Sequence, residues 1–409
     1  MKPKLILCLA LVLSGGLFVG CAAFKEHSAA MSNPTGVETS ISEIQMLDAK
    51  NGWAETGDLE NFRVLHTTDG GRTWANVTPN PLPGKFWDCK FMKPQMASIS
   101  YHDNGTCLLL TTNGGKSWSP WKPLGGFDNS THNYFLGDST YRFLNANDGL
   151  ADSIDGSAGS TQHTFFETHD GGLTWNTVHP HDQEPSATIG VSDINQDSMG
   201  FYPPANVIVV HGDMDDEMPK DAVRLSISTN LGESWRDMNL PFPSEKYREG
   251  LVEPRDPVFV DDKHIWLPVD IIKENTNETF AWKVLVFYMS EDGGETWTPR
   301  PGIIEESTNR FESERQHDIF SAKDIFICSG GNLYVTHDGA QSWQTIKPNI
   351  DFDRTISSGG VSQIDFVDTT HGWAVLYDTF KDFPHDKYFL CETSDGGKTW
   401  TELPLKITP

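Results

Sequence analysis

One short phrase recurs seven times in this 409-residue chain and constrains its fold more than any other feature. Each copy has Ser or Thr, then Asp or Asn two residues later, then one or two glycines, and it closes on Ser/Thr-Trp. The acid or amide and the tryptophan of the seven copies are Asp69 and Trp74, Asn113 and Trp118, Asp170 and Trp175, Asn230 and Trp235, Asp292 and Trp297, Asp338 and Trp343, and Asp395 and Trp400. Apolar runs precede most copies, and the tryptophan opens another short run, so the phrase predicts the turn of a β-hairpin.

Turn chemistry explains every residue type in the phrase. The Asp or Asn side chain can accept hydrogen bonds from backbone N–H groups just ahead of it, and the glycines supply positive φ without steric cost. The hydroxyl before the tryptophan can add a bond, and the indole has the area to fill a seam between neighbouring sheets. We therefore interpret the phrase as architectural rather than catalytic.

The spacing of the copies predicts the architecture. The six intervals between successive acids or amides run from 44 to 62 residues. Repeats of this size, each a small sheet that cannot bury its own faces, are typical of β-propellers. We predict an all-β fold, a seven-bladed β-propeller over residues 37–409 with one such hairpin per blade. A fainter Gly-Trp-Ala repeat, seen in 44–54, 141–151 and 364–374, predicts a strand, a turn and a strand upstream of the phrase.

The phrase resembles the Asp-box, or bacterial neuraminidase repeat. That repeat occurs in sialidases, xyloglucan-degrading glycosidases, sortilin-type sorting receptors and the photosystem II assembly-factor family. Combined with the Gly-Trp-Ala repeat, the chain is most similar to the assembly-factor type. The resemblance implies a fold and not a reaction.

The sialidase branch of this resemblance implies a site near the central axis, with three arginines, a Tyr–Glu pair and an Asp acid. Phe62-Arg63 is superficially similar to the arginine motif of that branch, but it directly precedes an Asp-box. Arg63 is therefore expected on the third strand of its blade, away from the axis. Arg142 is the clearest arginine on a strand expected to be innermost.

The N-terminus reads as a lipoprotein leader. Two lysines and an apolar stretch are followed by Gly20-Cys21, which predicts a signal peptide over 1–20, too short for a transmembrane helix. Residues 18–21 resemble a bacterial lipobox, with Phe18 where Leu is usual; this implies lipidation of Cys21, and 21–36 then form a flexible tether. The expected location is the outer or periplasmic side of a cell membrane, held by a lipid anchor. An ordinary signal peptide is the alternative.

The charge of the chain argues against two partner classes. With 57 acidic and 31 basic residues, the formal net charge is −26, which disfavours nucleic acid and anionic lipid headgroups. No cofactor is expected, and the protein is expected to be a monomer.

Two further groups of residues are candidate sites. Cys89 and Cys107 fall in one predicted blade and form a possible disulfide, with buried thiols as the alternative. The second group is a loop at residues 213–217 that is rich in acidic side chains. It lacks the regularly placed glycines of a calcium-binding loop, so a solvated charged loop is favoured over a metal site. Its weak candidate ligands are Asp213, Asp215, Asp216 and Glu217.

Long connections are expected on the face opposite the Asp-boxes, among them 76–88, 236–256 and 298–316. Long loops on a rigid scaffold are where binding usually resides. We predict a non-enzymatic binding or assembly protein that recognises a protein or an envelope glycan through this face, with Trp87 and Trp121 as aromatic candidates. The alternative is a glycoside hydrolase, which would need two carboxyls at a suitable separation.

Overall fold

The computed structural model of the chain describes most of the residues from 41 onward. The described ranges are 31–32, 38–39, 41–56, 62–82, 84–102, 106–121, 140–143, 147–157, 160–171, 174–178, 198–203, 205–211, 222–231, 234–248, 250–274, 280–305, 316–350, 352, 360–378 and 387–408.

The described residues form an all-β structure of antiparallel sheets. The first three four-strand units are β3 (Ile41–Met46), β4 (Gly52–Thr56), β5 (Arg63–Thr67) and β6 (Trp74–Asn76); β7 (Lys85–Lys93), β8 (Met96–His102), β9 (Thr106–Thr111) and β10 (Ser119–Trp121); and β11 (Thr140–Phe143), β12 (Gly149–Ser157), β13 (Ser160–Thr168) and β14 (Asn176–Thr177). The next two are β15 (Ser198–Tyr202), β16 (Asn206–His211), β17 (Ala222–Ser228) and β18 (Arg236–Pro241); and β19 (Leu251–Pro254) with β20 (Val258–Phe259), β21 (Ile265–Glu274), β22 (Phe280–Ser290) and β23 (Thr298–Glu305). The last two are β24 (Gln316–Ile319), β25 (Ile325–Ser329), β26 (Asn332–Thr336) and β27 (Gln344–Ile346); and β28 (Gly360–Phe366), β29 (Gly372–Asp378), β30 (Lys387–Thr393) and β31 (Thr401–Leu403).

Four short elements complete the described structure. β1 (Met31–Ser32) pairs with β2 (Glu38–Thr39), within and just after the segment expected to be a tether. A 3-10 turn spans Glu245–Tyr247. β32 (Ile407–Thr408) adds in parallel to the outer edge of β6, so the C-terminal segment of the described chain joins the sheet of β3 to β6.

Several strands extend into segments expected to be long loops. β7 begins at Lys85, β18 covers Arg236–Pro241 and β23 covers Thr298–Glu305. In β18 the side chains alternate, with Met238 and Leu240 facing the apolar core. An edge strand with only two inward-facing apolar side chains gives a weak alternation of apolar and polar residues. The segment of β18 is therefore hard to distinguish from a loop in the sequence.

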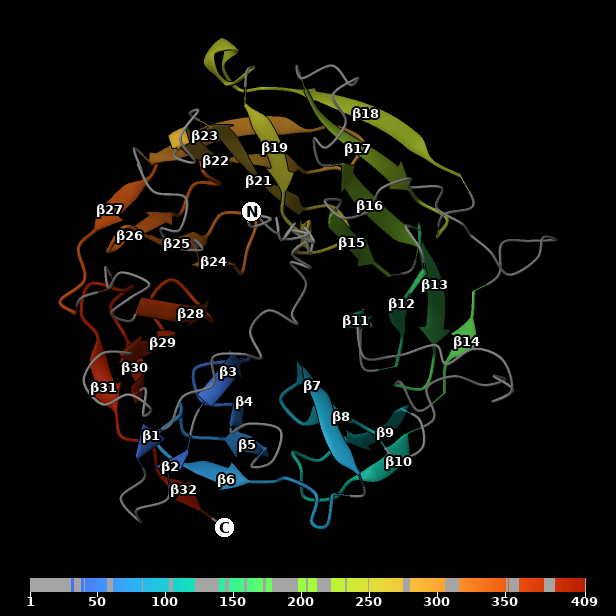
Figure 1. Cartoon of the computed structure of the whole chain (residues 1–409), viewed down its shortest axis with the longest axis vertical. Helices are drawn as coiled ribbons and strands as arrows, with labels where there is room; N and C mark the ends of the chain where they lie inside the picture. The colour runs from blue at the N-terminus through green and yellow to red at the C-terminus, as the bar shows by residue number, and fades with distance from the viewer. Residues whose placement is uncertain are drawn as a thin grey trace, which may run out of the picture.

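The sheets follow one another around a ring (Figure 1), and apolar clusters pack between consecutive sheets. β22 shows how alternation builds them: Val284, Val286 and Tyr288 pack toward the preceding sheet, whereas Leu285 and Phe287 pack toward the following one. The apolar clusters of the described residues each draw on two sheets that are consecutive or, in one case, on the first and the last. The sheets are therefore arranged as in a propeller.

The Asp-box turns close by the hydrogen bonds that the sequence predicts. In the first copy, Thr73 donates its N–H to Asp69 Oδ1 at 2.9 Å and its hydroxyl to Asp69 Oδ2 at 2.6 Å. Thr67 is buried; its hydroxyl donates to Asp69 and accepts the N–H of Gly71 at 2.9 Å. Where Asn replaces Asp, as at Asn113, the amide instead donates to the hydroxyl of Ser117. Acid and amide thus serve the same turn.

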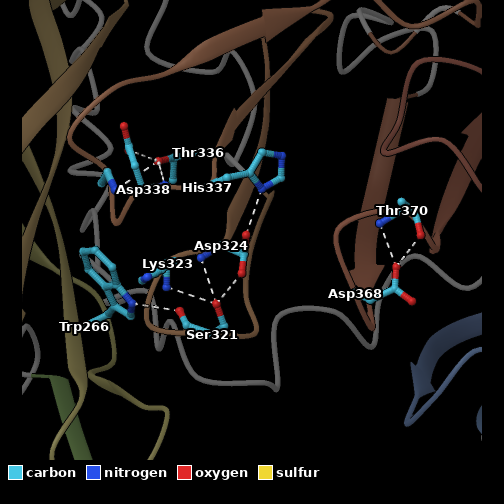
Figure 2. A network of polar contacts seen from close by, with 10 residues as sticks. Trp266, Ser321, Lys323, Asp324, Thr336, His337, Asp338, Asp368 and Thr370 are labelled. Atoms are coloured by element: carbon cyan, nitrogen blue, oxygen red, sulfur yellow. Dashed lines mark hydrogen bonds and ion pairs between the residues drawn. The ribbon is translucent and has the colours of Figure 1, made fainter.

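Each Asp-box is also joined to the turn between the first and second strands of its own sheet. The N–H of the residue after the Asp or Asn donates to a carbonyl of that turn in all seven sheets, at 2.8–3.0 Å. Figure 2 shows this face of the sixth sheet, where His337 Nδ1 meets Asp324 Oδ1 at 2.8 Å and the Ser321 hydroxyl accepts the N–H of Lys323 at 3.0 Å. The hairpin turns of one sheet therefore form one connected unit.

A tryptophan on the second strand links one sheet to the next. The indole N–H of Trp53 donates to Lys93 O, that of Trp266 to Ser321 O and that of Trp373 to Gly70 O, at 3.0–3.1 Å. Trp53 and Trp373 are the tryptophans of the Gly-Trp-Ala repeat, and Trp266 is near the start of β21 in the fifth sheet. The tryptophan of the Gly-Trp-Ala repeat therefore indicates a contact between neighbouring sheets.

Gly397→Ala should destabilise the protein by about 2–4 kcal/mol, because a left-handed residue gains a side chain and a packed site is overfilled. Gly397 has φ +84°, and an added Cβ would clash with the Leu333 side chain. Ala340 holds the equivalent position in the sixth sheet at φ +59° and is fully buried. Chemical denaturation of both variants tests this: Ala340→Gly should change stability by less than about 1 kcal/mol, because relief of the strained φ offsets the lost methyl. Equal effects would contradict the argument.

Candidate functional site

A pocket of about 370 Å³ lies at the ends of β5, β6 and β7. β5 runs from Arg63 at this pocket to Thr67 at the Asp-box, and β6 returns from the box to Asn76 at the pocket. The pocket therefore opens at the strand ends remote from the Asp-box turns. The sequence predicted a binding face at these ends.

The wall of the pocket is fixed by the hydrogen bonds of Thr78. The Val64 N–H donates to the Thr78 hydroxyl at 2.8 Å, and that hydroxyl donates to Asn76 Oδ1 at 2.7 Å. Behind this wall, the Asp-box Trp118 of the second sheet donates its indole N–H to Val77 O at 2.7 Å. An Asp-box residue thus positions a segment on the opposite face, and the wall is held from two sheets.

The lining combines aromatic, amide and basic side chains. Phe62 stacks on the buried Phe86, with ring centroids 3.3 Å apart and planes 13° apart. Arg63 is half-buried and Lys85 is exposed. Among the described lining residues there is no carboxylate, and none of the described carboxylates forms an ion pair with either base. The described lining therefore carries two basic side chains on a strongly acidic protein.

A second polar cluster joins the first strands of the last two sheets and the first sheet. Asp318 on β24 accepts the N–H of Phe366 on β28, and Asp365 on β28 accepts the N–H of Met46 on β3. Gln363 makes paired bonds with the backbone of Ile44, 3.0 Å to its N–H and 2.7 Å to its carbonyl. Within the described residues, neighbouring sheets share no backbone hydrogen-bond ladder, so these side chains supply the hydrogen bonds between them.

Burial perturbs both carboxyls of this cluster. Desolvation raises the pKa of Asp318 to about 7. Desolvation, and then the charge of Asp318, raises the pKa of Asp365 well above its usual range. Carboxyls with raised pKa values are among the groups that acid–base chemistry uses, so the sequence-based alternative of a hydrolase retains a physical basis.

Asp318→Asn should stabilise the protein at about pH 8 and bring little gain at about pH 4. A carboxyl whose pKa is raised on folding contributes stability below its unfolded pKa and loses it as pH rises through the folded pKa, here from about 4 to about 7. The amide cannot ionise, and its oxygen can still accept the Phe366 N–H. Thermal unfolding across this pH range measures the difference, and a gain largest at low pH would contradict the assignment.

Arginines lie where the sequence predicts them. Arg63 begins β5, the third strand of its sheet, and Arg142 lies on β11, the first strand of its sheet. The Arg142 guanidinium lies 5.1 Å from the Tyr202 ring centroid and 5.7 Å from that of Phe259, and burial lowers its pKa. Arg255 pairs instead with the buried Asp270 at 2.7 Å. Arg142 and Arg255 are therefore engaged in contacts between or within sheets.

The expected disulfide between Cys89 and Cys107 is wrong for this structure. Cys89 keeps a buried thiol, whose Sγ donates to Glu55 Oε2 at 3.1 Å. Cys89 lies on β7 and Cys107 on β9, and β8 runs between them, with Ile99 paired to Cys89. Strands two positions apart are about 9–10 Å apart, beyond the Cα separation of a disulfide. Two cysteines in the same sheet therefore need not lie on neighbouring strands.

Other predicted residues lie outside the described ranges. These are the lipidation residue Cys21 and the acidic loop residues Asp213, Asp215, Asp216 and Glu217. The backbones of Trp87 and Trp121 lie in β7 and at the end of β10. Within the described ranges, no group of three or more His, Cys, Asp or Glu residues is placed to hold a metal ion. The same ranges contain no helix of the length and apolarity needed to cross a membrane.

Comparisons with known proteins do not assign this chain a family. The family described as Sortilin-Vps10, "Sortilin, neurotensin receptor 3", matches residues 286–408, less than a third of the chain. No curated protein matches. Similar solved structures include YCF48 bound to D1 peptide, at 16% identity and TM-score 0.47 over 90% of both chains. An ulvan lyase of polysaccharide lyase family PL25 has 10% identity and TM-score 0.49 over 92% of this chain and 96% of the other. The microbial sialidase Hz136 has 13% identity and TM-score 0.36 over 74% and 67%.

Proposed function

We propose that this chain is a binding or assembly protein on the extracytoplasmic side of a cell membrane, anchored by a lipid on Cys21. It recognises a protein or an envelope glycan through the face opposite the Asp-boxes. The observation that supports this proposal is the pocket at the ends of β5 to β7, whose wall is held by Thr78 and Trp118. A preformed recess on a rigid scaffold lowers the entropy lost on binding.

The scaffold of this protein is proposed to be a seven-bladed propeller that acts as a monomer. Seven sheets of four or five strands within the described ranges, each with one Asp-box, support the blade number. The seam between the first and last sheets, in which Leu65 and Trp74 pack with Trp373 and Leu390, supports closure of the ring. β32 strengthens this closure because it brings the C-terminal segment onto the first sheet.

Glycoside hydrolysis is the second candidate, supported by the raised pKa values of Asp318 and Asp365. Each of these carboxyls already accepts a backbone N–H from the neighbouring sheet. A group committed to joining two sheets is less free to approach a glycosidic oxygen. Binding is therefore the better-supported function.

One experiment separates the two candidates. The full chain in detergent micelles is incubated with envelope polysaccharides, and new reducing ends are counted over time. We expect none, together with cross-linking of the chain to an envelope component. Sustained release that is lost in Asp318→Asn would overturn the binding proposal in favour of hydrolysis. Fractionation of cells that express Cys21→Ser tests the anchor, with release from the membrane as the expected result.

A further inference from the structure

We infer that the pocket at the ends of β5, β6 and β7 binds an anionic sugar residue, a ring that carries a carboxylate or a sulfate ester. This inference rests on the proposed binding function and names the ligand class of the same site. Its basis is the combination of Arg63, Lys85, Asn76, Asn80 and Phe62 around one recess.

The charge of the pocket selects an anion. The chain carries a formal net charge of −26, so an anionic ligand approaching most of its surface is repelled. The described lining of the pocket instead includes Arg63 and Lys85, and none of its described residues is a carboxylate. Arg63 is half-buried, and in a partly desolvated recess its planar guanidinium can hold a carboxylate or sulfate by two parallel hydrogen bonds. The exposed Lys85 adds a second positive charge at the mouth.

The neutral part of the lining suits a sugar ring. Asn76 and Asn80 are exposed amides that can bond hydroxyl groups. Asn76 Oδ1 already accepts the N–H and hydroxyl of Thr78, so its NH2 is the group available to a ligand. Phe62 is half-buried against Phe86 and offers an apolar surface for the C–H groups of a ring. The volume of about 370 Å³ lies near the lower end of small-molecule sites, which fits one or two rings.

A peptide is the less favoured occupant. Extended peptides commonly bind by adding a strand to an open sheet edge. The outer edge of β6 beside this pocket is already paired with β32, through Ile407 opposite Trp74 and Thr408 opposite Ala75. The recess lies at the strand ends and not along an edge, so its recognition depends on side chains.

The test is calorimetric titration of the full chain in micelles with four probes. They are a galacturonic acid trisaccharide, the methyl ester of that trisaccharide, a sulfated disaccharide and an acidic peptide. The trisaccharide or the sulfated disaccharide should bind, and the ester and the peptide should bind at least about tenfold more weakly, because a charged hydrogen bond is lost or the ring is missing. Affinity should fall as salt rises, because an ion pair is screened.

Three charge-neutralising variants complete the design. Arg63→Gln should weaken binding about tenfold or more, and Lys85→Gln by a smaller factor. Lys116→Gln is the matched control, because Lys116 is exposed within an Asp-box turn on the opposite face. Thermal unfolding of each variant checks that the fold is intact.

Two outcomes would overturn the inference: equal binding of the acid and its ester, or no binding of either anionic sugar by the folded chain. Stronger binding of the acidic peptide, lost in Arg63→Gln, would also overturn it in favour of a protein ligand. In these cases the proposed binding function stands if the chain still cross-links to an envelope component, and fails if it does not.

Discussion

Trp373→Ala should lower the free energy of unfolding by about 3–5 kcal/mol, the range expected when a buried tryptophan is truncated. Trp373 is 3% exposed and lies on β29 of the last sheet. It packs in the seam with Leu65 and Trp74 of the first sheet and donates its indole N–H to Gly70 O at 3.1 Å. Its loss would therefore open a cavity and remove a hydrogen bond at the contact between the first sheet, β3 to β6, and the last sheet, β28 to β31. Urea unfolding monitored by circular dichroism measures the change.

Two further variants separate packing from hydrogen bonding in this effect. Trp373→Phe keeps most of the apolar contact and loses the indole N–H, so it should cost about 1–2 kcal/mol. Trp266→Ala removes the equivalent link between the fifth and sixth sheets, where the indole donates to Ser321 O. A loss below about 1 kcal/mol for Trp373→Ala would show that the seam between the first and last sheets adds little to stability.

The turns of this fold could be read from the sequence because their chemistry is local. Asp395 and Thr399 lie within five residues of each other, so the pattern of residue types alone predicts the bonds that close the turn. The Gly-Trp-Ala repeat likewise predicted β3 with β4 and β28 with β29. The spacing of the copies then predicted the succession of small sheets.

Contacts between distant segments could not be read in this way. Asp365 and Met46 are 319 residues apart, and a single buried acid carries no periodic signal. The parallel addition of β32 to β6 joins residues more than 300 positions apart, as the pair of Ile407 with Trp74 shows, and spacing does not reveal such a contact. Cys89 and Cys107 show the same limit, because sequence proximity gave no information on the strand between them.

The sequence predicted the face on which the pocket lies, but not the pocket itself. The order of strands placed the connection after β6 opposite the Asp-boxes, and a loop from 76 was expected there. That Arg63, Asn76 and Lys85 would line one recess follows from three strand ends meeting, which needs the packing of two sheets. One sequence signal was available: two basic residues at strand starts in a strongly acidic chain.

Asp395→Ala should destabilise the protein by about 2–3 kcal/mol, because a buried hydroxyl loses its acceptor and a charge-assisted turn is lost. Asp395 Oδ1 accepts the hydroxyl of Thr393 at 2.9 Å and the N–H groups of Lys398 and Thr399 at 3.1 and 2.9 Å. Its Oδ2 accepts the Thr399 hydroxyl at 2.7 Å. Thr393 is 4% exposed, so water cannot readily replace the lost partner. Thermal and urea unfolding at neutral pH measure the cost.

Asp395→Asn is the matched control, and it should be nearly neutral at pH 7. The chain already uses Asn at two boxes, where Asn113 and Asn230 donate to Ser117 and Ser234 and accept the same backbone N–H groups. Burial alone would raise the pKa of Asp395, but the hydrogen bonds from Thr399, Thr393 and Lys398 together lower it in the folded protein. A carboxylate with a lowered pKa stabilises the fold above its unfolded pKa of about 4 and loses that contribution as pH falls through the folded value. The amide should therefore lose less stability than the wild type below about pH 4, and an Asn variant as unstable as the Ala variant at neutral pH would show that charge, not turn geometry, holds the box.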